Sequence, residues 1–96
     1  MTKNNQELVS IITPTYNCGR FIAETIESVQ AQTWKNWEML IVDDCSTDDT
    51  REVVAKYAES DLRIKYIKLK QNSGAATART VSMSLAQGVY MAFLDS

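Results

Sequence analysis

The chain has 96 residues, which is enough for one modest domain. Its composition, 45% hydrophobic and 23% charged, is typical of a globular protein and excludes a disordered tail. The 10 basic and 12 acidic residues give a net charge of −2, which provides no electrostatic basis for binding nucleic acid or an anionic membrane.

The residue types limit the chemistry further. The chain has no His, and its two cysteines, Cys18 and Cys45, lack CxxC spacing, so neither a Cys/His metal site nor a His-dependent catalytic pair is expected. The cysteines could form one disulfide, but two reduced thiols in a cytoplasmic protein are the favoured interpretation. No apolar run approaches the ~18 residues of a membrane span. We expect a soluble chain in the cytoplasm, or at the cytoplasmic face of the membrane within a longer protein.

The first half of the chain predicts two strands and two helices. Residues 8–13 are short, β-branched and apolar, and Pro14 ends this buried strand. Apolar residues at spacings of three and four predict an amphipathic helix over about 19–32. Residues 37–43 predict a second strand, and Asp48 or Asp49 is expected to cap a helix that ends near Ser60.

The second half continues the alternation. Residues 63–69 predict a strand with one solvated face, at an edge of the sheet. Ser73 is expected to cap a helix to about Gln87 that Gly88 stops, and residues 89–94 predict a fourth strand, apolar on both faces. The order predicts an α/β fold: a Rossmann-like three-layer α/β/α domain with a mainly parallel four-stranded sheet in the order 3-2-1-4.

Ligands of such sheets bind beyond the carboxyl ends of the strands, which directs attention to residues 14–19, 43–48, 71–75 and 95–96. The first segment has Gly19 as its one glycine, so it is not a GxGxxG pyrophosphate loop. The ring of Tyr16 could stack on a base while Thr15 and Asn17 hydrogen-bond the edge of that base. A plain turn with Tyr16 as a packing residue is the alternative.

Two adjacent acids follow the second strand. Asp43 or Asp44 could accept a hydrogen bond from a uracil N3–H or a ribose hydroxyl. Capping of the next helix is the alternative, and it suits Asp48 and Asp49 better because they lie closer to that helix. Neighbouring carboxylates repel when unpaired, so a ligand or a basic partner is expected beside Asp43 and Asp44.

The last two segments suggest a site for a diphosphate. Small residues around Gly74 would let phosphate approach the start of a helix, and Arg79 could reach a phosphate or the base. The alternative is an Ala-rich helix packed on the sheet with Arg79 solvated. Asp95, at the end of the last strand, could help to bind a hard divalent cation, although a plain turn would also explain it.

These segments, in this order and spacing, resemble the family 2 glycosyltransferases of the GT-A fold. The resemblance covers residues 8–96 and implies transfer of a sugar from a nucleotide-diphosphate donor, commonly a UDP-sugar, to an acceptor hydroxyl with inversion. Cell-surface polysaccharide or glycan synthesis is the implied setting, with a glycan or a lipid-linked molecule as acceptor. The matching stretches are VSII-x-PTYN, Ser28-Val29 with Gln32-Thr33 before Trp37-Glu38, IVDD-x-S-x-D-x-T, N-x-G-x-x-x-AR, and Gly88-x-Tyr90 leading to FLDS.

The resemblance also implies roles for single residues. Tyr16 would stack on the base, and Asp44 would bind it with Asp43 alongside. Asp95 would open the DxD motif that binds ribose and, through its partner acid, Mn²⁺ or Mg²⁺. The remaining residues of the implied nucleotide-sugar site are Pro14 and Thr15, which shape the base pocket, and Asn17, Gly74 and Arg79.

Two departures from the family pattern shape the expectations. Thr80 stands where the family often has Asn, and the second acid of DxD and the general base would lie beyond Ser96. We therefore expect a polar tail (residues 1–7) and the nucleotide-sugar-binding half of a transferase domain (residues 8–96). By itself this half would bind UDP weakly at most, hold no metal tightly, transfer no sugar, and self-associate through the edge of its fourth strand.

Two other functions remain open from the residues. One is a non-catalytic nucleotide-binding or interaction module that is natively this short. The other is a phosphoacceptor signalling domain, which is disfavoured because its acidic pair would follow the first strand, whereas here the pair follows the second.

Overall fold

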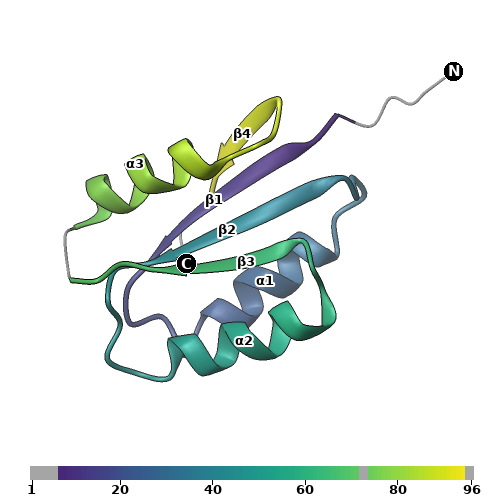
Figure 1. The fold of residues 1–96 in the computed structure, drawn as a ribbon. Coiled ribbons are helices and arrows are strands. Elements are labelled where there is room, and N and C mark those ends of the chain that lie inside the picture. Colours follow the sequence, from purple (N-terminus) through teal and green to yellow (C-terminus); the bar gives the residue numbers. More distant parts are fainter. Residues whose placement is uncertain (1–6, 72–73, 95–96) are drawn as a thin grey trace, which may run out of the picture.

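The computed structural model describes residues 7–71 and 74–94, in which strands and helices alternate along the chain (Figure 1). The sheet order is β3-β2-β1-β4, and each pair of neighbouring strands is parallel. The predicted α/β fold and strand order are thereby confirmed. The elements are β1 (Val9–Thr15), α1 (Ile22–Gln30), β2 (Trp37–Asp43), α2 (Thr50–Ser60), β3 (Ile64–Lys68), α3 (Ala75–Leu85) and β4 (Tyr90–Phe93).

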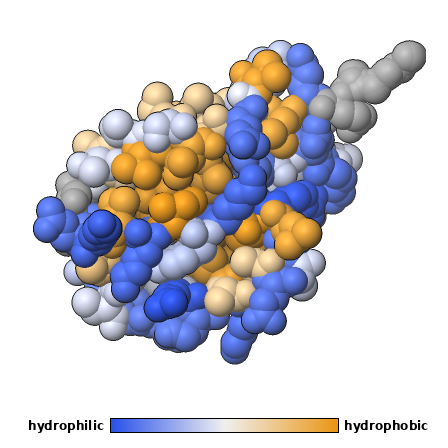
Figure 2. Space-filling view, in the orientation of Figure 1, coloured by the Kyte–Doolittle hydropathy of each residue, from blue (hydrophilic) through white to orange (hydrophobic). Residues whose placement is uncertain are grey.

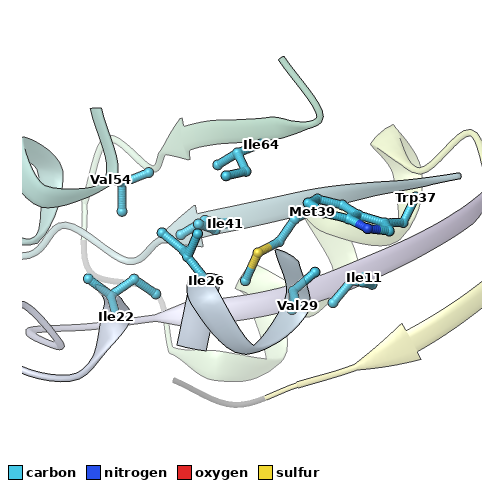
Figure 3. Packing of buried hydrophobic residues seen from close by; sticks show 9 residues of the cluster. All are labelled: Ile11, Ile22, Ile26, Val29, Trp37, Met39, Ile41, Val54 and Ile64. Atoms are coloured by element: carbon cyan, nitrogen blue, oxygen red, sulfur yellow. The ribbon is translucent and has the colours of Figure 1, made fainter. Parts of the chain in front are cut away.

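Helices cover both faces of the sheet, with α1 and α2 on one face and α3 on the other (Figure 1). The main core lies on the first of these faces, where one side of α1 meets the alternate residues of β1 and β2 that point toward it (Figure 3). The register places Met39 beside both Ile11 and Ile64, so these three side chains line one face. The core cluster is Ile11, Ile22, Ile26, Val29, Trp37, Met39, Ile41, Val54 and Ile64.

The first helix begins later than the sequence suggests, whereas the second begins where it was expected. The carbonyl of Cys18 accepts hydrogen bonds from the N–H groups of Phe21 and Ile22, both at 2.8 Å, so a turn precedes α1 and the helix starts at Ile22. Asp49 is the N-cap residue of α2, but it is the Asp48 carboxylate that accepts from the Thr50 N–H, at 3.0 Å. The capping role predicted for Ser73 falls outside the described residues.

The predicted role of Gly88 as a helix stop is wrong. Helix α3 ends at Leu85, and Ala86 already has an extended conformation (φ −68, ψ 134). Gly88 instead allows the chain to pass close to β1, because an added Cβ would lie 2.6 Å from Ser10 Oγ and 2.8 Å from the Leu8 carbonyl oxygen. The glycine is needed for this close approach of two chain segments, and Gly88 is not among the residues with positive φ.

The two edges of the sheet differ. Strand β3 forms one edge, as predicted, and α2 packs beside it. Strand β4 forms the other edge, and all four of its residues are exposed. Exposed apolar side chains on α3 and β4 include Met83, Leu85, Met91 and Phe93, and Figure 2 shows apolar side chains gathered where α3 lies. Within residues 7–71 and 74–94, no helix has the length and apolar character of a membrane span.

Candidate functional site

The carboxyl ends of the parallel strands bring the predicted loops together. The Asp44 N–H donates to the carbonyl of Thr15 at 2.8 Å, so the loops after β1 and β2 start side by side. The Leu69 N–H donates to the carbonyl of Asp43 at 2.9 Å, which brings the segment after β3 to the same place. Three of the four predicted site segments therefore begin next to one another, at the end of the sheet where the strands finish. Asp95 and Ser96, the fourth, lie outside the described residues.

The loop after β1 presents an accessible aromatic ring. Tyr16 is 48% exposed, which favours a surface for stacking over the alternative of a packing residue. Asn17 has a positive φ of 50, and its side-chain oxygen accepts from the Thr47 N–H at 2.8 Å. The Thr15 hydroxyl donates to the carbonyl of Thr13 at 3.2 Å, and Pro14 is half-buried. The loop is thus tied to the loop after β2, with the Tyr16 ring at its surface.

Asp43 is buried, and both of its carboxylate oxygens accept hydrogen bonds. Its Oδ1 accepts from the backbone N–H of Ser46 at 2.8 Å and from the Ser46 hydroxyl at 2.5 Å. Its Oδ2 accepts from the Tyr66 hydroxyl, and burial together with this carboxylate raises the pKa of Tyr66 above its usual range. Within the described residues, hydroxyl and backbone donors satisfy Asp43 in place of a basic partner, and the expected alternative of a ligand stays a prediction.

Asp44 joins the loop after β2 to the start of α3. Its Oδ2 accepts from the Gly74 N–H at 2.7 Å, and the carboxylate is largely buried. Gly74 has φ 92 and ψ 161, a conformation essentially confined to glycine. Arg79, one turn into α3, is exposed, and its guanidinium forms no hydrogen bond or ion pair with residues that the structure describes. The predicted residues Asp44 and Gly74 are therefore in direct contact.

Asp48 has a structural role that agrees with the capping alternative. Its Oδ1 accepts from the Thr50 N–H and hydroxyl, and its Oδ2 accepts from the Gly19 N–H at 3.0 Å. The Thr50 hydroxyl and these backbone donors lower the pKa of Asp48. Asp48 thus caps α2 and fixes the turn before α1 at the same time.

The described part of the site does not contain a metal-binding set. Within residues 7–71 and 74–94, no three His, Cys, Asp or Glu side chains gather in a way that could hold a metal ion. The metal predicted at Asp95 depends on a residue outside the described ranges and stays a prediction. Both cysteines are free thiols, as favoured from the sequence.

Sequence reasoning missed Ser46 and Tyr66 as partners of Asp43. Ser46 stands within the quoted IVDD-x-S pattern, so its spacing from Asp43 was a usable signal. No local signal marks Tyr66, which reaches Asp43 only through the register of β2 and β3. In that register Tyr66 pairs with Ile41, one step along the same face from Asp43.

The family model described as glycosyl transferase family 2 matches residues 10–96. The chain belongs to this family. The predicted family and GT-A type of fold are thereby confirmed.

Family 2 relatives extend well beyond the length of this chain. The putative teichuronic acid biosynthesis glycosyltransferase TuaG of Bacillus subtilis is 52% identical over 93 residues, which are 97% of this chain and 37% of TuaG. The chain therefore spans little more than a third of this relative.

Two solved structures have the same fold. TarS 1-349 of S. aureus, in complex with UDP, has a TM-score of 0.85 and 38% identity, with 92% of this chain and 27% of that one covered. The mannosyltransferase PcManGT of Pyrobaculum calidifontis, in complex with GDP-Man and Mn²⁺, has a TM-score of 0.87 and 26% identity, with 95% and 28% covered.

Proposed function

We propose that residues 8–96 form the nucleotide-sugar-binding half of a family 2 glycosyltransferase that uses a UDP-sugar. The observation that carries this proposal is the pairing of the Tyr16 and Asp44 loops, joined at 2.8 Å through the Asp44 N–H and the Thr15 carbonyl. An exposed ring and a carboxylate at one strand edge match the needs of a uracil, which has a face to stack and an N3–H to donate. Pro14, Thr15 and Asn17 would shape the pocket around the base.

The diphosphate would lie toward α3. The start of a helix favours an anion, because its N–H groups and the helix dipole point at the ligand. Gly74 begins this helix and is fixed to Asp44, and Arg79 is exposed on its first turns with its guanidinium unpaired among the described residues. We infer that Arg79 contributes charge to hold the phosphates while Gly74 keeps the helix start beside the base-binding acid.

The similar structures support a nucleotide diphosphate as ligand, and its base could be uracil or guanine. TarS was solved with UDP and PcManGT with GDP-Man, on the same fold. A carboxylate can accept from the N–H groups of either base, so Asp44 does not exclude guanine. We favour UDP because the identity to TarS, 38%, exceeds the 26% to PcManGT.

For the longer protein we propose sugar transfer to an acceptor hydroxyl with inversion, in the synthesis of a cell-surface polysaccharide or glycan. The name of TuaG, which refers to teichuronic acid biosynthesis, supports this setting, and a glycan or a lipid-linked molecule would be the acceptor. Mn²⁺ or Mg²⁺, held with the help of Asp95, would neutralise charge on the departing diphosphate. The free thiols of Cys18 and Cys45 support a cytoplasmic location.

The nucleotide site is tested by titrating the chain with UDP, with and without Mn²⁺, by NMR or calorimetry. Wild-type protein is expected to bind UDP weakly. Tyr16→Ala removes the stacking surface and should weaken binding by about 1–3 kcal/mol, which is roughly 5- to 150-fold. Asp44→Asn replaces an acceptor oxygen with a donor and should also weaken binding.

The matched control for Tyr16 is Trp34→Ala. Trp34 is similarly exposed, at 44%, but it precedes β2 and so lies at the amino-terminal edge of the sheet. UDP affinity should be unchanged in this variant. Equal losses in both variants, or no binding by the wild type, would count against the site, and tighter binding of GDP than of UDP would overturn the choice of base.

A further inference from the structure

We propose that Tyr66, on the edge strand β3, is a positioning residue for the nucleotide site, acting through Asp43 and Ser46 on the loops that carry Tyr16 and Asp44. This inference rests on the proposed function and deepens it. Tyr66 is five residues before Gln71, outside the four segments where strand ends pointed to a site. Its role follows from a chain of hydrogen bonds that crosses from β3 to the loop after β1.

The first step of this chain is the buried carboxylate of Asp43. The Tyr66 hydroxyl donates to one oxygen, and the N–H and hydroxyl of Ser46 donate to the other, at 2.8 and 2.5 Å. Asp43 is 1% exposed. A buried carboxylate with donors on both oxygens has a fixed orientation, because the loss of any donor leaves a desolvated charge underpaired. The Asp43 carboxylate therefore holds the loop after β2 in a fixed position.

The second step runs from Ser46 to the loop after β1. The Asn17 N–H donates to the Ser46 hydroxyl oxygen at 2.9 Å, and the Asn17 side chain accepts from the Thr47 N–H at 2.8 Å. Asn17 follows Tyr16 directly, and Asp44 follows Asp43 directly. The network thus fixes the neighbours of the two residues proposed to hold the base.

The direction of the protons explains why this network needs an acid and two hydroxyls. An ionised carboxylate only accepts, so the Tyr66 and Ser46 hydroxyls must both donate to Asp43. With its proton committed, the Ser46 oxygen is left to accept from the Asn17 N–H. The raised pKa of Tyr66, caused by burial and by Asp43, keeps that hydroxyl protonated and donating.

The loop after β2 also holds a backbone conformation that needs external support. Cys45, between Asp44 and Ser46, has a positive φ of 66, which is uncommon for a residue with a side chain. The two hydrogen bonds from Ser46 to Asp43 close this turn. Removing the Tyr66 hydroxyl would weaken the hold of Asp43 on Ser46 and allow the turn to relax, which would move Asp44.

The test compares Tyr66→Phe with Tyr57→Phe in the same UDP titration. Tyr57 is a matched control because its hydroxyl also donates to a carboxylate, that of Glu27, but it joins α2 to α1 away from the site loops. Tyr66→Phe should weaken UDP binding roughly 5- to 10-fold, since a hydrogen bond to a charged group is lost. Tyr57→Phe should leave the affinity unchanged.

A second readout separates positioning from general stability. Backbone amide resonances of Asn17 and Ser46 should shift in Tyr66→Phe and stay in place in Tyr57→Phe. Ser46→Ala provides an independent variant should Tyr66→Phe fail to fold, and it should weaken UDP binding as well. The loss of UDP-binding free energy in the double variant should be smaller than the sum of the losses in Tyr66→Phe and Ser46→Ala, because both residues act through Asp43.

The possible results of these titrations separate the role of Tyr66 from the proposed binding of UDP. If wild-type protein does not bind UDP, the proposed function fails and this inference with it. If wild-type protein binds and Tyr66→Phe binds equally well, with the Asn17 and Ser46 resonances unmoved, the inference alone is overturned. Equal losses in Tyr66→Phe and Tyr57→Phe would assign the effect to stability and would also overturn it.

Discussion

Gly74 shows how much a single backbone conformation can decide at this site. Its φ of 92 and ψ of 161 are strained for any residue with a Cβ, and its N–H is the donor to Asp44. Gly74→Ala should therefore introduce ~1–3 kcal/mol of local strain, break that hydrogen bond and weaken UDP binding. Apart from its chain neighbours, no atom of the described residues lies within 4 Å of the added Cβ, so strain and not crowding is the expected effect. UDP titration together with urea unfolding measures both effects.

Gly88→Ala is the contrasting variant. Its added Cβ would lie 2.7 Å from the Ser10 backbone nitrogen, so the protein should lose stability through a clash at the amino-terminal edge of the sheet. The folded fraction should still bind UDP as the wild type does. If Gly88→Ala weakens UDP binding as much as Gly74→Ala, the specific role assigned to Gly74 is wrong.

At the scale of elements, Glu38 fixes the connection between α3 and β4 to three strands. Its Oε2 accepts from the Ser10 hydroxyl at 2.6 Å and the Gln87 N–H at 2.7 Å, and its Oε1 accepts from Lys65 Nζ at 2.9 Å. Burial would raise the pKa of Glu38, but the hydrogen bonds from Gln87, Ser10 and Lys65 outweigh it and place the pKa below the usual 4.5. Glu38 is thus stabilised in its charged form.

Glu38→Gln should lower the free energy of unfolding at neutral pH by ~2 kcal/mol. One buried acceptor oxygen becomes an amide NH₂ that faces groups which are themselves donors. The folded-state pKa is depressed, so the contribution of Glu38 is complete above about pH 4.5 and is lost as the pH falls through the folded-state pKa. The variant should therefore lose less stability on acidification than the wild type. Urea unfolding at neutral and acidic pH checks both points.

The control for Glu38 is Glu59→Gln, at an exposed position on α2. It removes the same charge from the surface and should change stability little. A similar loss in both variants would show that net charge, and not the buried cluster, is responsible.

At the scale of the whole molecule, the β4 edge is the least covered part of the sheet. Met91 and Phe93 are 46% and 51% exposed, and an unpaired strand edge with apolar side chains favours pairing with another chain. We expect self-association that grows with protein concentration, measurable by light scattering or sedimentation. Met91→Lys should reduce it, whereas Ala55→Lys on the exposed side of α2 should not. A monodisperse wild-type monomer at high concentration would contradict this expectation.

Much of the element order and loop placement could be predicted from local patterns. The apolar runs that became β1 and β2, and the spacing of Ile22, Ile26 and Val29 in α1, are local signals of strand and helix. Because the strands are parallel, their order also fixed which loops meet at one edge. The predicted start of α1 was less accurate, because it depends on the turn in which the Cys18 carbonyl accepts hydrogen bonds from Phe21 and Ile22.

The sequence by itself determined the family, the strand order and the loops that carry Tyr16, Asp44 and Gly74. These features depend on short motifs and on the periodicity of apolar residues, which are local in the sequence. Only the tertiary structure decided what each polar group does. It gave Asp43 the donors Ser46 and Tyr66, joined Asp44 to Gly74, and made Gly88 a point of close approach. The physical reason is that a buried polar group takes the donors that strand register brings to it, and register depends on the packing of the whole sheet.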